Sequence, residues 1–228
     1  MKRKNMPKWL ILPVLLPLVV GLFVPCIASA DPATAVMVQP ISKAVGIGED
    51  FTVDIFVDPD TDIAGAQLRL SFDPSVVTAN SVTEGNLLSQ GGASTYFMTG
   101  TIDNVAGTIT NVAGATAIPG ASVSQSGTFA TVSFTAGTAV GTSALDLSNV
   151  IVGNLQGQAV AIIVSDGSVT VCPDWDVNLD LSANVLDMIL MGQHWGETGA
   201  GHWIREDVNR DGAINVLDMI LIGQHWTG

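Results

Sequence analysis

The chain has 228 residues, with 21 acidic and eight basic side chains and a formal net charge of −13. A chain this acidic repels nucleic acid and anionic lipid headgroups, which argues against a protein that binds either. It attracts divalent cations and basic partners instead.

Residues 1–30 are typical of a secretory signal peptide. Four of the eight basic residues stand at its start, the segment from Trp9 to Ile27 is almost entirely apolar, and Ala28-Ser29-Ala30 is a small-residue cleavage signal. We therefore expect a secreted protein cleaved near Ala30; the apolar run is long enough that a membrane or lipid tether is an alternative. The mature chain would carry 21 acids against four bases, a formal charge of −17, and a single cysteine, Cys172, so it could form no internal disulfide.

Residues 31–171 are predicted to form a jelly-roll β-sandwich. Short segments of alternating apolar residues are separated by clusters of Gly, Asp, Asn, Pro and Ser, and eight or nine such strands suggest two packed sheets. No amphipathic helix is expected before residue 184, and the small, polar stretch 113–127 is expected to be a surface loop. The expected strands include Thr34–Val38, Phe51–Val57, Ala66–Phe72, Gly107–Val112, Thr128–Phe134, Ser143–Leu147 and Ala161–Val171.

Residues 172–228 contain one 12-residue motif twice, 31 residues apart. Asp176–Asp187 recurs as Asp207–Asp218, with oxygen-bearing residues at positions 1, 3, 5, 9 and 12 of each copy. Together with the main-chain carbonyl of position 7, this is the spacing that a 12-residue loop uses to bind Ca²⁺. We therefore predict two calcium ions. The predicted ligands are Asp176, Asn178, Asp180, the Ser182 carbonyl, Asn184 and Asp187 in loop 1, and Asp207, Asn209, Asp211, the Ala213 carbonyl, Asn215 and Asp218 in loop 2.

Each loop runs into a segment that predicts a helix. Asn184 and Asn215 are expected to cap helices over Val185–Trp195 and Val216–Trp226, each with an apolar stripe. The terminal tryptophans are expected to be core or interface anchors. Two acidic surface turns would share the composition of the loops, but they would not explain the duplicated spacing and the matching helices.

The two loops differ at position 6, where the sharp turn of a calcium loop needs glycine. Loop 2 has Gly212 there and loop 1 has Leu181. A left-handed conformation costs a non-glycine residue on the order of 1 kcal/mol or more. We therefore predict that loop 1 binds calcium more weakly than loop 2.

On these motifs the region 172–228 resembles a dockerin, the duplicated calcium-loop module that joins enzymes to cellulosome-type scaffolds. The resemblance implies calcium-dependent binding to a cohesin, through positions just after the ninth loop residue and further along each helix. The implied partner-binding residues are Val185, Leu186, Gly192 and Gln193, with Val216, Leu217, Gly223 and Gln224 as the mirror set. Many dockerins have Ser or Thr at the first pair, so the aliphatic residues here suggest a more hydrophobic interface.

Residues 31–171 resemble a cohesin, the jelly-roll receptor for dockerins. The matching segments are 48–53, 63–74, 127–134 and 166–171. The resemblance implies a non-catalytic, secreted assembly protein whose partners are cohesin- or dockerin-bearing proteins, with self-association as an open alternative and polysaccharide involved only indirectly. The β region has no His, no Trp and no Gly-x-Ser-x-Gly motif, so no catalytic constellation is predicted. The alternative function is a carbohydrate-binding or cell-surface adhesion protein that uses the β-sandwich.

Overall fold

The computed structural model describes residues 33–117 and 120–227, so the predicted signal peptide lies outside the described residues. Within these ranges the chain forms twelve strands, one short 3₁₀ turn and two helices, and residues 33–227 belong to one compact unit. No helix of the described ranges is long and apolar enough to cross a bilayer. The strands are β1 (Thr34–Gln39), β2 (Ser42–Gly46), β3 (Asp50–Asp58), β4 (Gly65–Ser71), β5 (Val77–Glu84), β6 (Thr95–Met98), β7 (Thr101–Asp103), β8 (Thr108–Thr116), β9 (Gly127–Ala136), β10 (Gly141–Gly153), β11 (Ile162–Ser165) and β12 (Gly167–Cys172).

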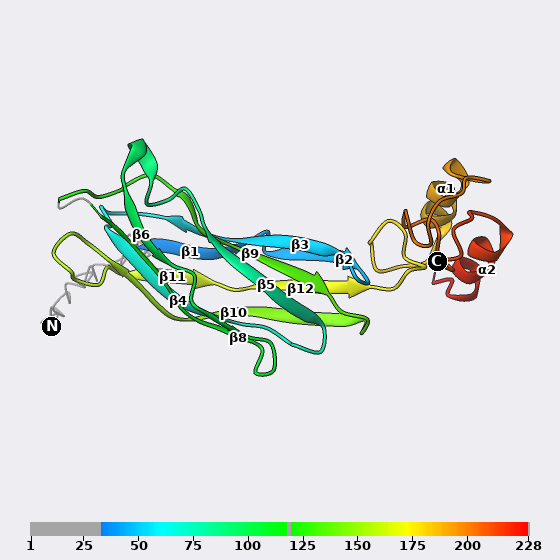
Figure 1. The fold of residues 1–228 in the computed structure, drawn as a ribbon, viewed down its shortest axis with the longest axis horizontal. Helices are drawn as coiled ribbons and strands as arrows, with labels where there is room; N and C mark the ends of the chain where they lie inside the picture. Colours follow the sequence, from blue (N-terminus) through cyan, green and yellow to red (C-terminus); the bar gives the residue numbers. More distant parts are fainter. Residues whose placement is uncertain (1–32, 118–119, 228) are drawn as a thin grey trace, which may run out of the picture. The chain divides into compact units, whose positions relative to one another are not determined.

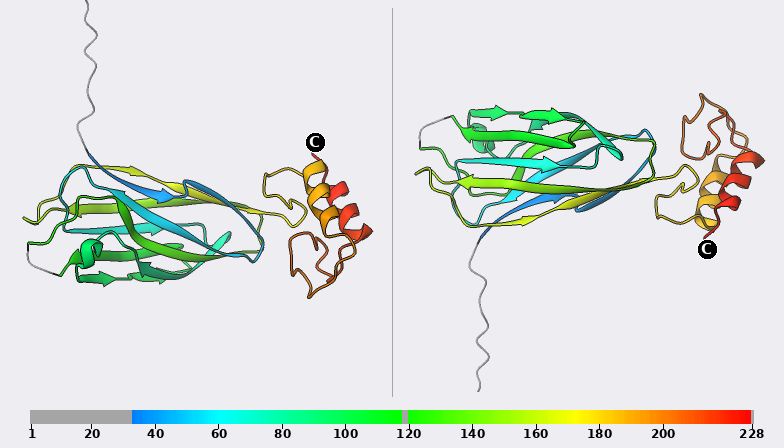
Figure 2. Two further views of the ribbon diagram at one scale, coloured as in Figure 1. Left: turned by 90° about the horizontal axis from the view of Figure 1, so that it is seen from above. Right: turned by 90° about the horizontal axis from the view of Figure 1, so that it is seen from below.

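The strands form the two layers of a β-sandwich, as predicted (Figures 1 and 2). One sheet has the order β11-β1-β3-β9-β5, and the other has the order β2-β12-β10-β4-β8-β6, with β7 paired to β8. β1 and β2 are consecutive in the chain but belong to different sheets, and the Gln39–Pro40 peptide bond between them is cis.

Alternating apolar residues of both sheets fill the space between the layers. On β3 the side chains of Phe51, Val53, Ile55 and Val57 are all buried, as the sequence pattern predicts. Phe134 of β9 stacks on Phe51 with 5.5 Å between ring centroids. This contiguous core explains how the described residues form a sandwich of this size without a disulfide.

The sequence predicted seven of these segments and missed four strands, β2, β5, β6 and β7. It was also wrong at the start of the loop predicted for 113–127, because β8 continues to Thr116. That stretch is rich in Ala, Gly and Thr and has no apolar alternation, so only its pairing with β4 and β6 makes it a strand. The predicted final strand is divided into β11 and β12, which lie in different sheets.

Two nine-residue helices follow the sandwich, α1 (Val185–Gln193) and α2 (Val216–Gln224). Each helix begins where predicted and ends two residues earlier than predicted. His194 and His225 are the C-caps. The helices pack on a second, separate hydrophobic cluster. Its buried members are Val177, Ala183, Met191, Val208, Ile214 and Ile222.

Candidate functional site

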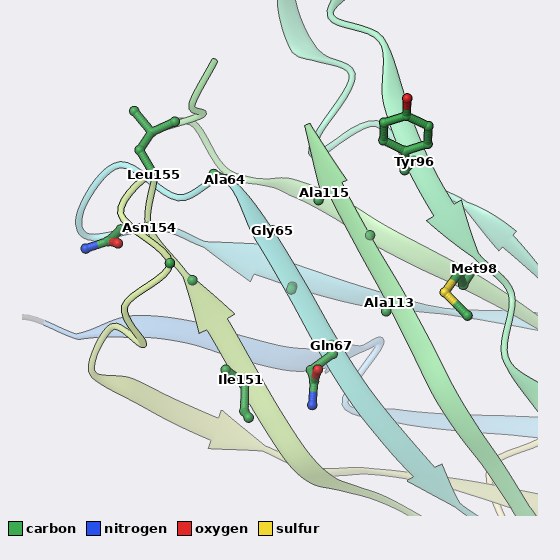
Figure 3. Close-up of a pocket in the computed structure, with 14 residues that line it drawn as sticks. Ala64, Gly65, Gln67, Tyr96, Met98, Ala113, Ala115, Ile151, Asn154 and Leu155 are labelled. Carbon is green, nitrogen blue, oxygen red and sulfur yellow. The ribbon is translucent and has the colours of Figure 1, made fainter. Parts of the chain in front are cut away.

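The outer face of the seven-stranded sheet carries a shallow trough of about 480 Å³ (Figure 3). Its floor consists of glycine and alanine residues on β4 and β8. Tyr96 and Met98 of β6 stand along one side, and Ile151 and Leu155 along the other. These four side chains are among the large apolar residues that remain exposed to solvent.

None of the fourteen residues that line this trough is charged. That is unusual for a chain with 21 acidic side chains, and an exposed apolar patch without charge is typical of a protein-binding surface. We call it the sheet-face trough. The sequence did not identify a binding face, because β6 was missed and the part of β8 from residue 113 onward was assigned to a loop.

The two acidic loops have the same backbone conformation. Positions 4 and 6 have positive φ angles in both copies: 62° at Leu179 and 71° at Leu181 in loop 1, and 60° at Arg210 and 82° at Gly212 in loop 2. Leu181 therefore adopts the left-handed conformation that its position 6 requires, as the sequence suggested. The identical pattern shows that the duplicated spacing produces a duplicated fold.

The carboxylate at position 1 of each loop organises the turn that follows it. In loop 1, Asp176 accepts hydrogen bonds from the main-chain N–H groups of Asp180 and Leu181, at 3.1 and 2.9 Å. In loop 2, Asp207 accepts from the corresponding groups of Asp211 and Gly212, both at 3.0 Å. The loop therefore winds around the first carboxylate.

The carboxylate at position 12 closes each loop and begins each helix. Asp187 accepts from the N–H groups of Val177 (2.8 Å) and Asn184 (2.8 Å), while the Asn184 side chain accepts from Leu186 N–H at 2.8 Å. This is a reciprocal capping box, and Asn215 with Asp218 form the same one. The predicted N-caps are thus confirmed.

All four of these carboxylates, at positions 1 and 12 of both loops, have a relative exposure of 0%. None of them forms an ion pair with Lys, Arg or His within the described residues. A buried carboxylate is costly unless a cation or a set of hydrogen bonds compensates its charge. Burial raises the pKa of Asp176, although hydrogen bonds from the main chain of Leu181 and Asp180 oppose that effect.

The remaining predicted ligands lie close to one another in each loop. Asn178 donates to Asp180 at 2.8 Å, and Asn209 donates to Asp211 at 2.8 Å. The amide of Asn215 contacts the carbonyl of Ala213 at 2.9 Å. The structure therefore brings together positions 3 and 5 of both loops, and positions 7 and 9 of loop 2.

In the described residues, no group of three or more Asp, Glu, His or Cys side chains is placed to hold a metal ion by itself. The loops fit a metal in another way, because half of each predicted ligand set consists of Asn side chains and a main-chain carbonyl. Such an oxygen-only, mixed set suits Ca²⁺.

The eight residues that the sequence predicted for partner binding are all exposed on the two helices. The aliphatic stripe is exposed as well: Leu186 and Ile189 of α1 are 51% and 53% exposed, and Leu217 and Ile220 of α2 are 51% and 48% exposed. One apolar face of each helix therefore packs inward and the other is exposed to solvent. The terminal tryptophans, Trp195 and Trp226, are half exposed and are not core residues.

The ends of the helical region are fastened to the loops. Thr227 donates through its N–H to the carbonyl of Ala183 at 2.8 Å, and its hydroxyl accepts from Ala183 N–H at 2.9 Å. Trp175, just before loop 1, stacks on the ring of His225 with centroids 4.7 Å apart. These contacts close the region on itself.

A family model described as the Cohesin domain matches residues 36–171, more than half of the chain. The chain belongs to the cohesin family. The matched region ends at residue 171, just before the acidic repeats, so the loops and helices lie beyond the cohesin domain. No curated protein sequence matches the chain.

Solved structures share the fold of this cohesin domain. A chain of the Coh-OlpA–Doc918 complex, a type I cohesin–dockerin complex from Clostridium thermocellum, aligns with a TM-score of 0.51 and 12% identity over 61% of this chain and 99% of that one. A type II cohesin domain from the cellulosome of Acetivibrio cellulolyticus aligns with a TM-score of 0.50 and 18% identity over 60% of this chain and 95% of that one. At these identities the likeness establishes the cohesin fold alone.

Proposed function

We propose that this chain is a secreted, non-catalytic assembly protein that binds other proteins through both of its parts. The cohesin domain would receive a dockerin-bearing partner, and residues 172–228 would act as a calcium-dependent, dockerin-like plug. The observation that carries the proposal is that both parts expose uncharged apolar surfaces in a strongly acidic chain.

The sheet-face trough supports the receptor role. Its floor of small residues allows a partner helix to approach the sheet closely, and its walls offer apolar contacts from Tyr96, Met98 and Ile151. Because the trough has no charge to desolvate, burying it costs little. Members of the cohesin fold have been solved in complexes with dockerins.

The buried carboxylates support the calcium role. In each loop the aspartates of positions 1, 5 and 12, the asparagines of positions 3 and 9, and the carbonyl of position 7 would hold the ion. Calcium would supply the positive charge that Asp176, Asp187, Asp207 and Asp218 lack within the described residues. Because helices of nine residues are marginal alone, ion binding and helix formation would be coupled.

The ordered helices would then present their outer faces to a partner. Val185 and Leu186 at the start of α1, and Val216 and Leu217 at the start of α2, are all more than half exposed. Their equivalence follows from the duplication. A cohesin on another protein is the partner that this surface would suit.

The receptor role is tested by placing a charge in the trough. Ala115 is exposed on β8 and lines the trough, so Ala115→Glu adds a carboxylate there without disturbing the core. The immobilised mature chain should capture a dockerin-bearing protein from the host's secreted proteins, and the variant should lose most of that capture. Thr78→Glu on the opposite sheet is the matched control.

The plug role is tested with position 12 of each loop. Asp187→Asn and Asp218→Asn keep the shape of the side chain and remove its charge, so each should remove one of two calcium ions in a titration. Binding of the mature chain to cohesin-bearing proteins should require calcium and be lost in the double variant. Capture that is equally strong with EDTA would contradict the plug role, and glycan binding by residues 31–171 would favour the carbohydrate-binding alternative.

A further inference from the structure

Arg205, between the two acidic repeats, contacts both loop 1 and the cohesin domain. Its Nη2 donates to the main-chain carbonyl of Asp176 at 2.8 Å, and its Nε donates to that of Val177 at 3.1 Å. These residues are the first two of loop 1. Its remaining nitrogen, Nη1, forms an ion pair with Glu49 of the cohesin domain at 2.7 Å.

Glu49 is itself fixed in the turn between β2 and β3. Its second carboxylate oxygen accepts from the N–H of Gly46 at 2.9 Å. Burial alone would raise the pKa of Glu49, but the hydrogen bond from Gly46 and the contacts with Arg205 outweigh it and lower the pKa below its ordinary value of 4.5. The carboxylate of Glu49 therefore stays charged at neutral pH and keeps its ion pair with the guanidinium of Arg205.

Gly46 leaves room for this contact. A Cβ added at Gly46 would lie 1.8 Å from Nη1 of Arg205, so any larger residue there would push the guanidinium away from Glu49. The backbone of Gly46 does not have a positive φ, and an alanine is conformationally permitted at this position. The glycine is thus needed for the space that the guanidinium occupies.

We infer that Glu49 and Arg205 couple the cohesin domain to loop 1, so that calcium in loop 1 and contact between the two parts stabilise each other. This inference rests on the proposed calcium role. Arg205 holds the main chain of Asp176 and Val177 in place, which preorganises the first carboxylate of the loop for the ion. Coupling between two sites is reciprocal. An ion that orders loop 1 would therefore also order the carbonyls of Asp176 and Val177, which accept hydrogen bonds from Arg205.

This coupling would set the orientation of the cohesin domain relative to the helical region. With calcium, the two parts should move as one body, and partners bound to them would be held at a fixed relative orientation. Without calcium, loop 1 would release the guanidinium and the two parts would move independently. Loop 2 has no such connection in the described residues, because Arg210 of loop 2 pairs with Asp174 outside the cohesin domain.

The test uses the mature chain, with amide resonances of each loop to report calcium binding and ¹⁵N relaxation to report the rotational correlation time of each part. Glu49→Gln, Arg205→Met and Gly46→Ala should each weaken calcium binding at loop 1, by roughly two- to fivefold for the partly exposed Glu49–Arg205 pair. Loop 2 should be unchanged. Each variant should also give two separate correlation times where the calcium-bound wild type gives one.

Glu84→Gln removes an exposed carboxylate on β5 and is the matched control, which should behave as the wild type. Wild-type affinity at loop 1 and a single correlation time in all three variants would overturn the coupling and leave the calcium role standing. A wild-type chain that binds no calcium would overturn both.

Discussion

At the scale of single residues, the two acidic loops show how one backbone conformation tolerates different side chains. Position 6 has a φ of 71° at Leu181 and 82° at Gly212. Leu181 is 60% exposed, so its side chain contributes little packing to offset the cost of that conformation. At Gly212 a side chain is sterically excluded, since a Cβ would lie 2.6 Å from the carbonyl oxygen of Gly199.

The first prediction follows from this difference. Leu181→Gly should tighten calcium binding at loop 1 by about 1 kcal/mol, or roughly fivefold, because the conformational cost is removed. Gly212→Leu should weaken loop 2, because the new side chain meets Gly199. Isothermal titration of both variants measures the two effects, and unchanged affinity in both would show that position 6 does not limit binding.

Cys172, the last residue of β12, is fully buried. Burial first, and then the nearby carboxylate of Asp176, raise the pKa of its thiol to about 11. The thiolate is the reactive form, so burial and the raised pKa should both slow reaction of this thiol in the folded chain.

The second prediction is that Cys172, which is fully buried, resists alkylation at pH 8 in the folded chain. Because its pKa is raised, the thiolate fraction stays low until the pH approaches 11 or the chain unfolds. Iodoacetamide labelling followed by mass spectrometry, with and without guanidinium chloride, measures this. Equally fast labelling of the folded and unfolded chains would contradict the burial of the thiol.

At the scale of elements, the helix pair depends on contacts beyond its small core. The buried cluster beneath it has six members, fewer than a stable domain needs by itself. The stack of Trp175 on His225 and the hydrogen bonds between Thr227 and Ala183 fasten the start of the region to its end. The equivalent main-chain bonds join Gly196 and Glu197 to Ile214 of loop 2.

The third prediction compares the contributions of Trp175 and Trp195 to the stability of the helix pair. Trp175→Ala should destabilise the calcium-bound helix pair by about 2 kcal/mol, because it removes a partly buried, stacked ring. Trp195→Ala should cost less, since this ring is 50% exposed. Urea unfolding followed by helical circular dichroism at 222 nm gives both values, and a larger loss for Trp195 would refute the role of the stack.

At the scale of the whole molecule, two regions gain stability from different sources. The cohesin domain has a continuous hydrophobic core between two sheets. The helical region has a small core and four buried carboxylates, which accept main-chain hydrogen bonds and which we propose bind calcium. A loss of divalent cations should therefore affect the two regions unequally.

The fourth prediction is that excess EDTA removes the helical signal of the mature chain and leaves the β-sheet signal unchanged. Calorimetry should show two transitions, of which only that of the helical region moves upward in temperature with added calcium. Magnesium at the same ionic strength serves as the control for general screening of charge. A helical region that keeps its transition in EDTA would argue against a structural role for the ion.

The sequence by itself determined the features that follow local rules. Duplicated oxygen spacing predicted the two loops, and Asn184 and Asn215 marked the helix starts, since capping depends on residues a few positions apart. Alternation on segments such as 51–57 predicted strands and their buried faces. The cohesin resemblance of residues 31–171, drawn from short motifs, agrees with the family match.

Only the tertiary structure decided what depends on distant pairing. β8 extends through the Ala-Gly-rich stretch that the sequence assigned to a loop, because β4 and β6 complete its hydrogen bonds. The sheet-face trough exists only after those strands lie side by side, and the contact between Glu49 and Arg205 joins residues 156 positions apart. Local sequence patterns carry no information on such long-range contacts, because side chains far apart in sequence form a common surface only when the sheets and loops have assembled.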